Sequence, residues 1–231
     1  MSNPGYDHPA RPRTLFPLIR HLSYPVTILL LRTPLTANQA TFLSMIPGLA
    51  AAYFLFFGGY MFGIVGSVFL FFNYLLDHCD GEIARAKNQS SRFGHEFDTF
   101  VDWIVHTALF AAMGHGALLE TGQIIWLWFG LAASIGGTIN YALSVYWRLR
   151  KSGGDPDAIG SDTEPDAAPD PEGLKSVLIV AFREFARAAF WAIVLALALM
   201  DWMRYLLPFA AVGAQVYWIL QFTVRGNDHR V

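Results

Sequence analysis

The chain of 231 residues is 54% hydrophobic and only 15% charged, with a formal net charge of −2. Soluble domains usually carry about a quarter charged residues, so this composition excludes an ordinary soluble domain and favours a protein that lies in lipid. The single cysteine, Cys79, excludes an internal disulfide, and we expect no nucleic-acid partner.

The N-terminal part, residues 1–38, is predicted to be a cytoplasmic N-terminus with an interfacial helix. The first fourteen residues are polar and proline-rich, without the apolar core of a cleavable signal peptide. Residues 14–32 mix apolar side chains with two arginines and a histidine, and Pro25 interrupts them. This pattern predicts an amphipathic helix that lies in the cytoplasmic membrane interface.

The rest of the chain is dominated by long apolar blocks, and a helix needs about 20 mostly apolar residues to cross the hydrocarbon core. Six blocks approach this length: 40–58, 61–79, 96–114, 122–146, 177–200 and 205–224. The sequence therefore predicts an all-α polytopic membrane protein with six transmembrane helices plus the N-terminal interfacial amphipathic helix.

These helices are expected to form one catalytic domain in two parts. Residues 39–150 hold the first four spans, and residues 174–231 hold the last two spans and a cytoplasmic C-terminus. Between them, residues 151–173 contain seven acidic residues and four prolines with almost nothing apolar, which indicates a flexible acidic cytoplasmic linker.

The basic residues predict the orientation. If the N-terminus is cytoplasmic, nearly every Lys and Arg outside the spans lies on the cytoplasmic side, and only Arg204 lies on the other. Cytoplasmic loops collect basic residues, so we expect an integral protein of the inner membrane with both termini inside. The second and third predicted spans meet at this same side, which places the segment 77–102 there.

Four aspartates stand at this junction. Asp77 and Asp80 are three residues apart on one predicted helix, and Asp98 and Asp102 are four apart on the next. Each pair therefore lies on one helical face, and the four can converge across an antiparallel helix pair. Ionisable residues inside a membrane span are costly and indicate a functional site.

Oxygen ligands without histidine or thiolate clusters suit hard cations such as Mg²⁺, Mn²⁺ or Ca²⁺. Two such ions held together would clamp a phosphoryl group during in-line displacement. Small residues at Gly81, Ala84 and Gly94 share the strip of surface with the acids and predict the floor of a pocket. The other acids near helix ends are interpreted as caps or solvated interface residues: Glu82, Glu96, Glu120 and Asp201.

From Asp77 to Asp102 the chain reads Asp-x2-Asp-Gly-x2-Ala-Arg-x8-Gly-x3-Asp-x3-Asp. This segment resembles the signature of the CDP-alcohol phosphotransferase family, and all eight fixed positions match. The signature covers 26 residues, and the six-helix layout extends the resemblance across the chain.

The resemblance implies a role for each position of the signature. Asp77, Asp80 and Asp98 would hold a pair of divalent ions, Mg²⁺ or Mn²⁺, and Asp77 and Asp80 would also contact the bound CDP moiety. Asp102 would be the general base on the acceptor hydroxyl and a further metal contact. Three other positions would contact CDP, the last of them through its phosphates: Gly81, Ala84 and Arg85. The family also implies a homodimer.

Upstream, residues 33–41 resemble a Thr-Pro-Asn-x2-Thr segment common at the start of the family's first helix. Ala37 replaces the proline here, whereas Asn38 and Thr41 remain. Asn38 is therefore a candidate CDP contact, and the alternative is that it caps the helix.

The function implied is transfer of a substituted phosphate from a CDP-alcohol, with CDP-diacylglycerol as the expected donor, to an acceptor alcohol. CMP is released, and the product belongs to phospholipid biosynthesis, with membrane lipid as a partner. The alternative is a divalent-cation channel or transporter that uses the Asp cluster. Against it, the acids gather at one membrane face, and a channel leaves the Asp-Gly-x2-Ala-Arg arrangement unexplained.

The acceptor is less determined by the sequence. Arg183 and Arg187 lie four apart on one helical face, and Arg148 adds charge at the end of the fourth predicted span. Together they could hold an acceptor phosphate, as in inositol phosphate or glycerol 3-phosphate. Alternatively, Arg183 and Arg187 snorkel to anionic headgroups. His106, one turn from Asp102, either orients that residue or is a packed histidine.

Overall fold

The computed structural model describes residues 18–151 and 190–227, and within these ranges the ordered elements are all helical. In chain order they are α1 (Leu18–Leu31), α2 (Ala37–Phe56), α3 (Tyr60–Ala86), α4 (Arg92–Thr121), α5 (Ile124–Lys151), α7 (Phe190–Leu199), the short 3₁₀ helix η1 (Met203–Tyr205) and α8 (Leu206–Asn227). The prediction of an all-α chain is confirmed for this part of the protein.

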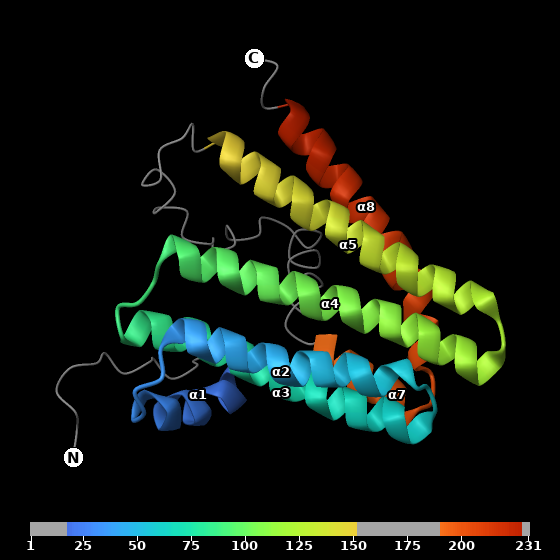
Figure 1. Ribbon diagram of the computed structural model, residues 1–231, viewed down its shortest axis with the longest axis horizontal. Helices are drawn as coiled ribbons and strands as arrows, with labels where there is room; N and C mark the ends of the chain where they lie inside the picture. The colour runs from blue at the N-terminus through green and yellow to red at the C-terminus, as the bar shows by residue number, and fades with distance from the viewer. Residues whose placement is uncertain (1–17, 152–189, 228–231) are drawn as a thin grey trace, which may run out of the picture.

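The long helices form a bundle with α4 in the middle (Figure 1). α2 and α3 pack on each other along their length, and α2 also packs on α4. On the opposite side α4 packs on α5, and α5 packs on α8. α1 and α7 both contact α3, so the helix that carries Asp77 and Asp80 is covered along two stretches of its length.

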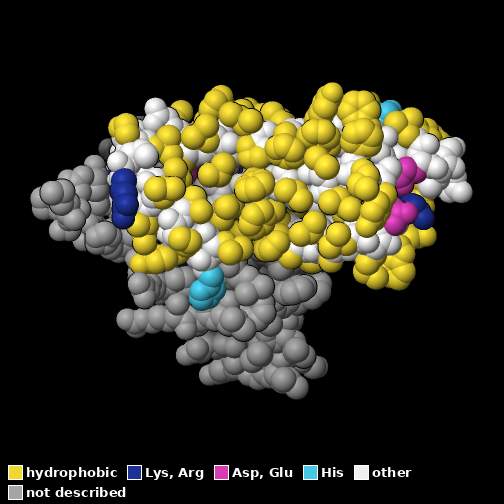
Figure 2. Space-filling view, turned by 90° about the horizontal axis from the view of Figure 1, so that it is seen from below, with side chains coloured by type: hydrophobic (Ala, Val, Ile, Leu, Met, Phe, Trp, Pro, Cys, Tyr) yellow, Lys and Arg dark blue, Asp and Glu magenta, His cyan; other side chains and the backbone are white. Residues whose placement is uncertain are grey.

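Within residues 18–151 and 190–227, three helices are long and apolar enough to cross a membrane, namely those at Ala37–Phe56, Tyr60–Ala86 and Ile124–Arg150. Figure 2 shows one long face of the molecule covered by apolar side chains, with charged groups near its two ends. An integral membrane protein follows from these features, whereas the count of six spans remains a prediction. All of the predicted linker 151–173 except Lys151, and the first part of the fifth predicted span, lie outside the described residues.

α2 begins with a capping box. The Thr36 hydroxyl accepts from the Gln39 backbone N–H at 3.3 Å, and the Gln39 side chain accepts from the Thr36 N–H at 3.0 Å. Two otherwise orphaned backbone donors are satisfied in this way. The cap is therefore Thr36, and the alternative that Asn38 caps the helix is wrong. Asn38 lies inside the first turn instead.

α4 extends well beyond its apolar block because both of its ends are built from capping residues. The Ser91 hydroxyl accepts from the Gly94 N–H at 3.0 Å and opens the helix. Gly122, with φ of 70°, closes it in the left-handed conformation that glycine adopts without strain. α4 consequently begins before the carboxylate pair Asp98 and Asp102 and continues to Thr121, beyond the predicted block 96–114.

α1 is fastened to α3 by hydrogen bonds as well as by apolar packing. Ser23 and Thr27 are fully buried, and their hydroxyls donate to the two Glu82 carboxylate oxygens at 3.1 and 2.5 Å. The expectation that Glu82 is a cap or solvated residue is therefore wrong. α1 continues as a helix through Pro25, so the proline does not interrupt it.

Candidate active site

Three of the four signature aspartates, one on α3 and two on α4, converge. Asp77, Asp98 and Asp102 each place a carboxylate oxygen within 4.8 Å of the other two. Asp77 Oδ1 is buried and has no hydrogen-bond partner among the described residues. Like charges at this separation repel, and a buried acceptor without a donor is costly, so a cation bound among the three carboxylates would stabilise the cluster.

Asp80 lies beside this cluster and faces α2. Its Oδ2 accepts a hydrogen bond of 2.5 Å from Thr41 Oγ1, and both side chains are buried, at 7% and 3% exposure. The i, i+3 spacing on α3 thus gives the two acids different partners. Asp77 faces α4, whereas Asp80 is held by a hydroxyl of α2.

A cavity of about 200 Å³ opens between the N-terminus of α2, the C-terminal turns of α3 and the start of α4. We call it the α2–α3–α4 cavity. Two carboxylates, Asp80 and Asp98, lie on its wall. The other signature and upstream residues that line it are Asn38, Gly81, Ala84, Arg85 and Gly94. All the residues predicted to contact CDP, except Asp77, therefore line this one cavity.

Glycines keep this cavity open. A methyl group at Gly94 would come within 3.0 Å of Asn38 Oδ1, and one at Gly81 would contact the Arg85 guanidinium at 3.5 Å. Arg85 itself is exposed in the last turn of α3, where its guanidinium can reach a ligand in the cavity. An exposed guanidinium at the edge of the cavity can pair with a phosphate group of a ligand.

A second cavity, of about 270 Å³, lies between α4 and α5 and is closed on one side by Ala214 of α8. We call it the α4–α5 cavity. Asp102 lies on its wall, whereas none of the other three signature aspartates does. The carboxylate cluster thus stands between two cavities, with Asp98 on the first and Asp102 on the second.

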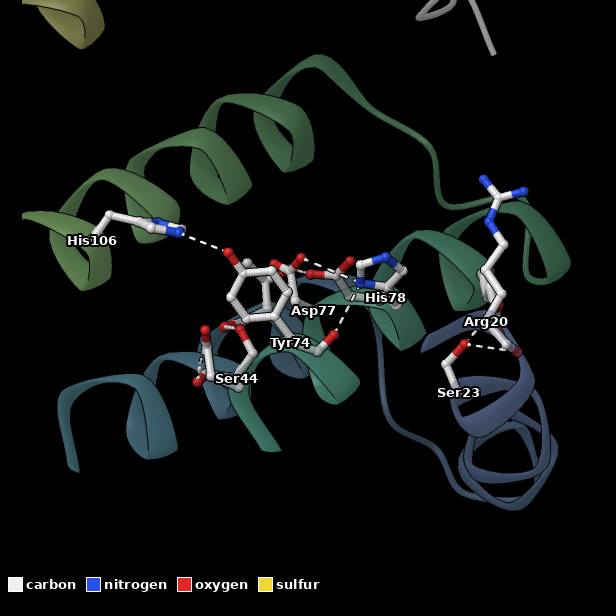
Figure 3. A network of polar contacts seen from close by, with 11 residues as sticks. Arg20, Ser23, Ser44, Tyr74, Asp77, His78 and His106 are labelled. Atoms are coloured by element: carbon white, nitrogen blue, oxygen red, sulfur yellow. Dashed lines mark hydrogen bonds and ion pairs between the residues drawn. The ribbon is translucent and has the colours of Figure 1, made fainter. Parts of the chain in front are cut away.

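A contact between His106 and Tyr74 connects α4 and α3 beside Asp77 (Figure 3). His106 Nδ1 lies 2.8 Å from the Asp102 backbone carbonyl, and its Nε2 lies 3.0 Å from the Tyr74 hydroxyl. His106 therefore contacts Asp102 through the backbone rather than through the carboxylate. His78, one turn after Tyr74, has Nδ1 3.0 Å from the Tyr74 carbonyl and 3.9 Å from Asp77 Oδ2.

Of the three arginines predicted to bind an acceptor phosphate, the structure describes only Arg148. Arg148, at the end of α5, pairs with Glu96 of α4, with 3.1 Å between Nη2 and Oε2. Glu96 is therefore an ion-pair partner rather than a solvated cap. Arg183 and Arg187 lie outside the described residues, so their predicted role stays a prediction.

The residues present fit a divalent cation. The cluster supplies only oxygen ligands, which Mg²⁺ and Mn²⁺ prefer, and it includes a buried carboxylate oxygen without a donor. The described residues hold no Cys or His in the same group. Which ion is bound, and whether there are two, remain predictions.

Sequence reasoning missed the contacts that join distant helices. The bond from Thr41 to Asp80 spans 39 residues, and that from Thr27 to Glu82 spans 55. Thr41 carried a signal, because it stands in the upstream segment that resembles the family. The residues of α5 that line the α4–α5 cavity, such as Asn140 and Tyr141, carried none.

Residues 34–217 match the CDP-alcohol phosphatidyltransferase family. A curated relative, the bifunctional IPC transferase and DIPP synthase of Aquifex aeolicus (strain VF5), is 28% identical over 111 residues. That match covers 48% of this chain but only 24% of the relative, so the chain spans about a quarter of its length.

Two solved structures have a similar fold. The Mycobacterium tuberculosis phosphatidylinositol phosphate synthase with CDP-DAG bound aligns with a TM-score of 0.51 and 22% identity, over 85% of this chain and 90% of that one. Its apo form aligns with the same score and identity, over 86% and 94%. Because the family match spans most of the chain and contains the whole aspartate signature, the protein belongs to the CDP-alcohol phosphatidyltransferase family.

Proposed function

We propose that the protein transfers a substituted phosphate from a CDP-alcohol to the hydroxyl of an acceptor alcohol and releases CMP. The observation that carries this proposal is the convergence of three signature carboxylates between two separate cavities. One cavity has the residues to hold a nucleotide, and the other has the carboxylate that can act as a base. CDP-diacylglycerol is the proposed donor, and a homodimer in the membrane is the proposed assembly.

The donor is proposed to lie in the α2–α3–α4 cavity. Arg85 at the edge of this cavity would hold a phosphate of the CDP moiety, and Gly81 and Ala84 would let the ligand approach the helix backbone. Asn38 offers an amide in the same cavity. The phosphorus that carries the alcohol would then lie toward Asp98, at the border with the second cavity.

The acceptor is proposed to enter the α4–α5 cavity, where Asp102 takes the proton from its hydroxyl. The acceptor oxygen forms a bond to the phosphorus that bears the donor alcohol. The bond from that phosphorus to the bridging oxygen breaks, and this oxygen leaves with CMP. Asp102 then returns its proton to solvent, so charge and atoms balance.

Asp77, Asp80, Asp98 and Asp102 are the residues that would hold Mg²⁺ or Mn²⁺. When bound, such ions supply positive charge to the phosphoryl oxygens and the leaving oxygen. The chain's own part is orientation: Thr41 fixes Asp80, and the His106–Tyr74 bond fixes the turn of α4 that carries Asp102. We also propose that this site and both termini face the cytoplasm, as the distribution of basic residues favours.

The test is CMP release by the full-length protein in vesicles with CDP-diacylglycerol and Mn²⁺ or Mg²⁺. Glycerol 3-phosphate, inositol 1-phosphate, glycerol, inositol, serine and water are compared as acceptors. We expect acceptor-dependent release that falls at least about 10²-fold in Asp102→Asn, because a general base contributes 10²–10⁴-fold. The matched control is Asp201→Asn, which removes a carboxylate far from the signature and should not lower the rate.

Metal-dependent CMP binding separates the possible failures. If CMP binds with Mn²⁺ but none is released from CDP-diacylglycerol, the donor assignment is wrong and the transferase class stands. If CMP neither binds nor is released, the proposed enzyme is wrong. Divalent-cation flux through the same vesicles would then favour the channel alternative.

A further inference from the structure

The α4–α5 cavity contains no Lys or Arg side chain among its described lining residues. His106 also lines it, but both of its ring nitrogens already contact the Asp102 carbonyl and the Tyr74 hydroxyl. Apart from Asp102 and His106, the polar wall consists of neutral groups, which include Thr99, Asn140, Tyr141 and Ser144. A cavity built to hold a phosphate usually presents Arg or Lys to it, or several backbone N–H groups. This one presents hydroxyl, amide and aromatic groups instead.

Asn140 offers an unused hydrogen-bonding atom to this cavity. Its Oδ1 is buried and has no partner within the described part of the chain. Buried polar atoms in native proteins nearly always have a partner, so a ligand hydroxyl that donates to Oδ1 would complete the site. Neutral ligand pockets are commonly apolar with a few such polar groups.

Trp103 and Tyr141 form a rigid wall beside Asn140. Their rings stack with centroids 4.9 Å apart and planes inclined by 11°, and the Trp103 indole N–H donates to Thr138 Oγ1 at 3.1 Å. Because Trp103 has its donor satisfied, it offers the cavity a flat apolar surface rather than a further polar contact. A polyol carries C–H groups, which can pack on such a surface, next to hydroxyl groups, which can bond to the polar side chains.

The nearest cation of α5, Arg148, is already neutralised. It lies one turn beyond Ser144, and its partner Glu96 lies one turn before Thr99, so the ion pair stands at one end of the α4–α5 cavity. The two side chains are only 20% and 33% exposed. An acceptor phosphate that approached Arg148 would meet the Glu96 carboxylate, and like charges at contact distance repel strongly in a partly buried site.

We propose that the α4–α5 cavity takes an uncharged polyol as the acceptor, that Asn140 accepts a hydrogen bond from it, and that Glu96, paired with Arg148, discriminates against phosphorylated acceptors. This inference rests on the proposed function and names its acceptor class. It gives Arg148 a part in excluding phosphate rather than binding it.

The experiment compares matched acceptor pairs in the vesicle assay, namely inositol with inositol 1-phosphate and glycerol with glycerol 3-phosphate. For the wild-type protein we expect a higher kcat/KM with the neutral member of each pair. Glu96→Gln removes the repelling charge and leaves Arg148 in place, so the ratio of kcat/KM values should shift toward the phosphorylated member by about tenfold or more. The matched control is Glu120→Gln, which breaks an ion pair with Arg204 elsewhere and should leave the ratio unchanged.

Asn140→Leu tests the hydrogen bond inside the cavity. We expect the KM for the neutral acceptor to rise about tenfold, while the KM for the donor stays the same. CMP binding with Mn²⁺, which uses the other cavity, shows whether the variant is folded. If Asn140→Leu fails this check, Asn140→Ala is measured instead.

Two results would overturn the inference. One is that the wild-type protein prefers the phosphorylated acceptors, or uses no neutral polyol of the panel at all. The other is that Glu96→Gln leaves the acceptor ratio as it was. In both cases CMP release or metal-dependent CMP binding still reports separately on the proposed function.

Discussion

At the scale of single residues, Asp80 is distinguished by a buried hydroxyl donor. Thr41 reaches it from α2 at 2.5 Å, so the carboxylate of one helix is oriented by the neighbouring helix. Groups that orient metal ligands typically contribute 10–100-fold in metal affinity. Thr41 is therefore expected to be a positioning residue, although it lies outside the signature.

Thr41→Val keeps the shape of the side chain and removes the donor. We expect the affinity for Mn²⁺ to fall about 10–100-fold. Thr41→Ser, which keeps the hydroxyl, should retain most of the affinity. The readout is the electron paramagnetic resonance signal of free Mn²⁺ during titration of the purified protein. Equal affinities in the three proteins would show that Thr41 does not position Asp80.

The carboxylate cluster predicts opposite effects on stability and on metal binding. Without metal, Asp77, Asp98 and Asp102 repel one another, so Asp77→Asn should raise the melting temperature measured in EDTA. With Mn²⁺ the order should reverse, because wild-type protein gains stability from the bound ion and the variant gains less. Thermal unfolding in detergent, with and without Mn²⁺, measures both. A variant that melts earlier in EDTA would contradict the repulsion argument.

The sequence was sufficient to identify these acids, because residues three and four apart on a helix share one face. It could not show that Asp80 is bound by a hydroxyl of α2 while the other three carboxylates form the cluster. That difference depends on where α2 lies, and no local pattern specifies the contact between Thr41 and Asp80. The same holds for Asn140, an amide in the middle of an apolar span with no motif around it.

At the scale of helices, the apolar blocks predicted where each described helix lies but not where it ends. The predicted apolar block 61–79 corresponds to α3, which continues to Ala86. The helix extends beyond the block because α1 and α2 pack on α3. The block 96–114 became α4, whose ends are set by Ser91 and Gly122. Caps and tertiary shelter, rather than hydropathy, decide such boundaries.

α1 provides a prediction at this scale. Its attachment to α3 depends on Glu82, whose carboxylate accepts from Ser23 and Thr27. Hydrogen bonds to a charged group contribute about 1.5–3 kcal/mol each, so Glu82→Ala should release the helix. Hydrogen–deuterium exchange followed by mass spectrometry should show faster exchange in Leu18–Leu31 and unchanged exchange in α5.

Glu82→Gln serves as the comparison, because its side-chain oxygen still accepts one hydrogen bond. We expect exchange in α1 between that of the wild-type protein and that of Glu82→Ala. Unchanged exchange in α1 of Glu82→Ala would mean that the apolar packing of Ile19 and Leu31 holds the helix without Glu82.

At the scale of the whole molecule, α4 joins the two halves of the bundle through glycines on opposite faces. A methyl group at Gly116 would overlap the Leu55 carbonyl oxygen and come within 3.0 Å of Gly58 N, which brings α4 against the end of α2. A methyl group at Gly114 would lie 2.9 Å from the Trp126 carbonyl oxygen and 3.0 Å from Gly130 Cα of α5. Small residues that let helix backbones approach closely are typical of helix contacts in membranes.

Both the α2–α3–α4 cavity and the α4–α5 cavity depend on this close approach, because α4 contributes a wall to each. We therefore expect Gly116→Ala to destabilise the protein by about 1–3 kcal/mol, as overpacking of a tight contact does. CMP binding with Mn²⁺ should weaken as well, although the glycine lies at the opposite end of α4 from the carboxylates. Thermal unfolding in detergent and CMP titration measure the two effects.

Gly213→Ala is the matched control, because a methyl group at Gly213 of α8 would meet nothing within 4 Å. Alanine is the better helix former by about 1 kcal/mol, so this variant should melt at the same temperature or higher. If Gly116→Ala melts like Gly213→Ala and binds CMP normally, the helices tolerate a wider spacing. The position of α4 would then be set by its contacts with α5 and by the carboxylate end, rather than by glycine packing along its whole length.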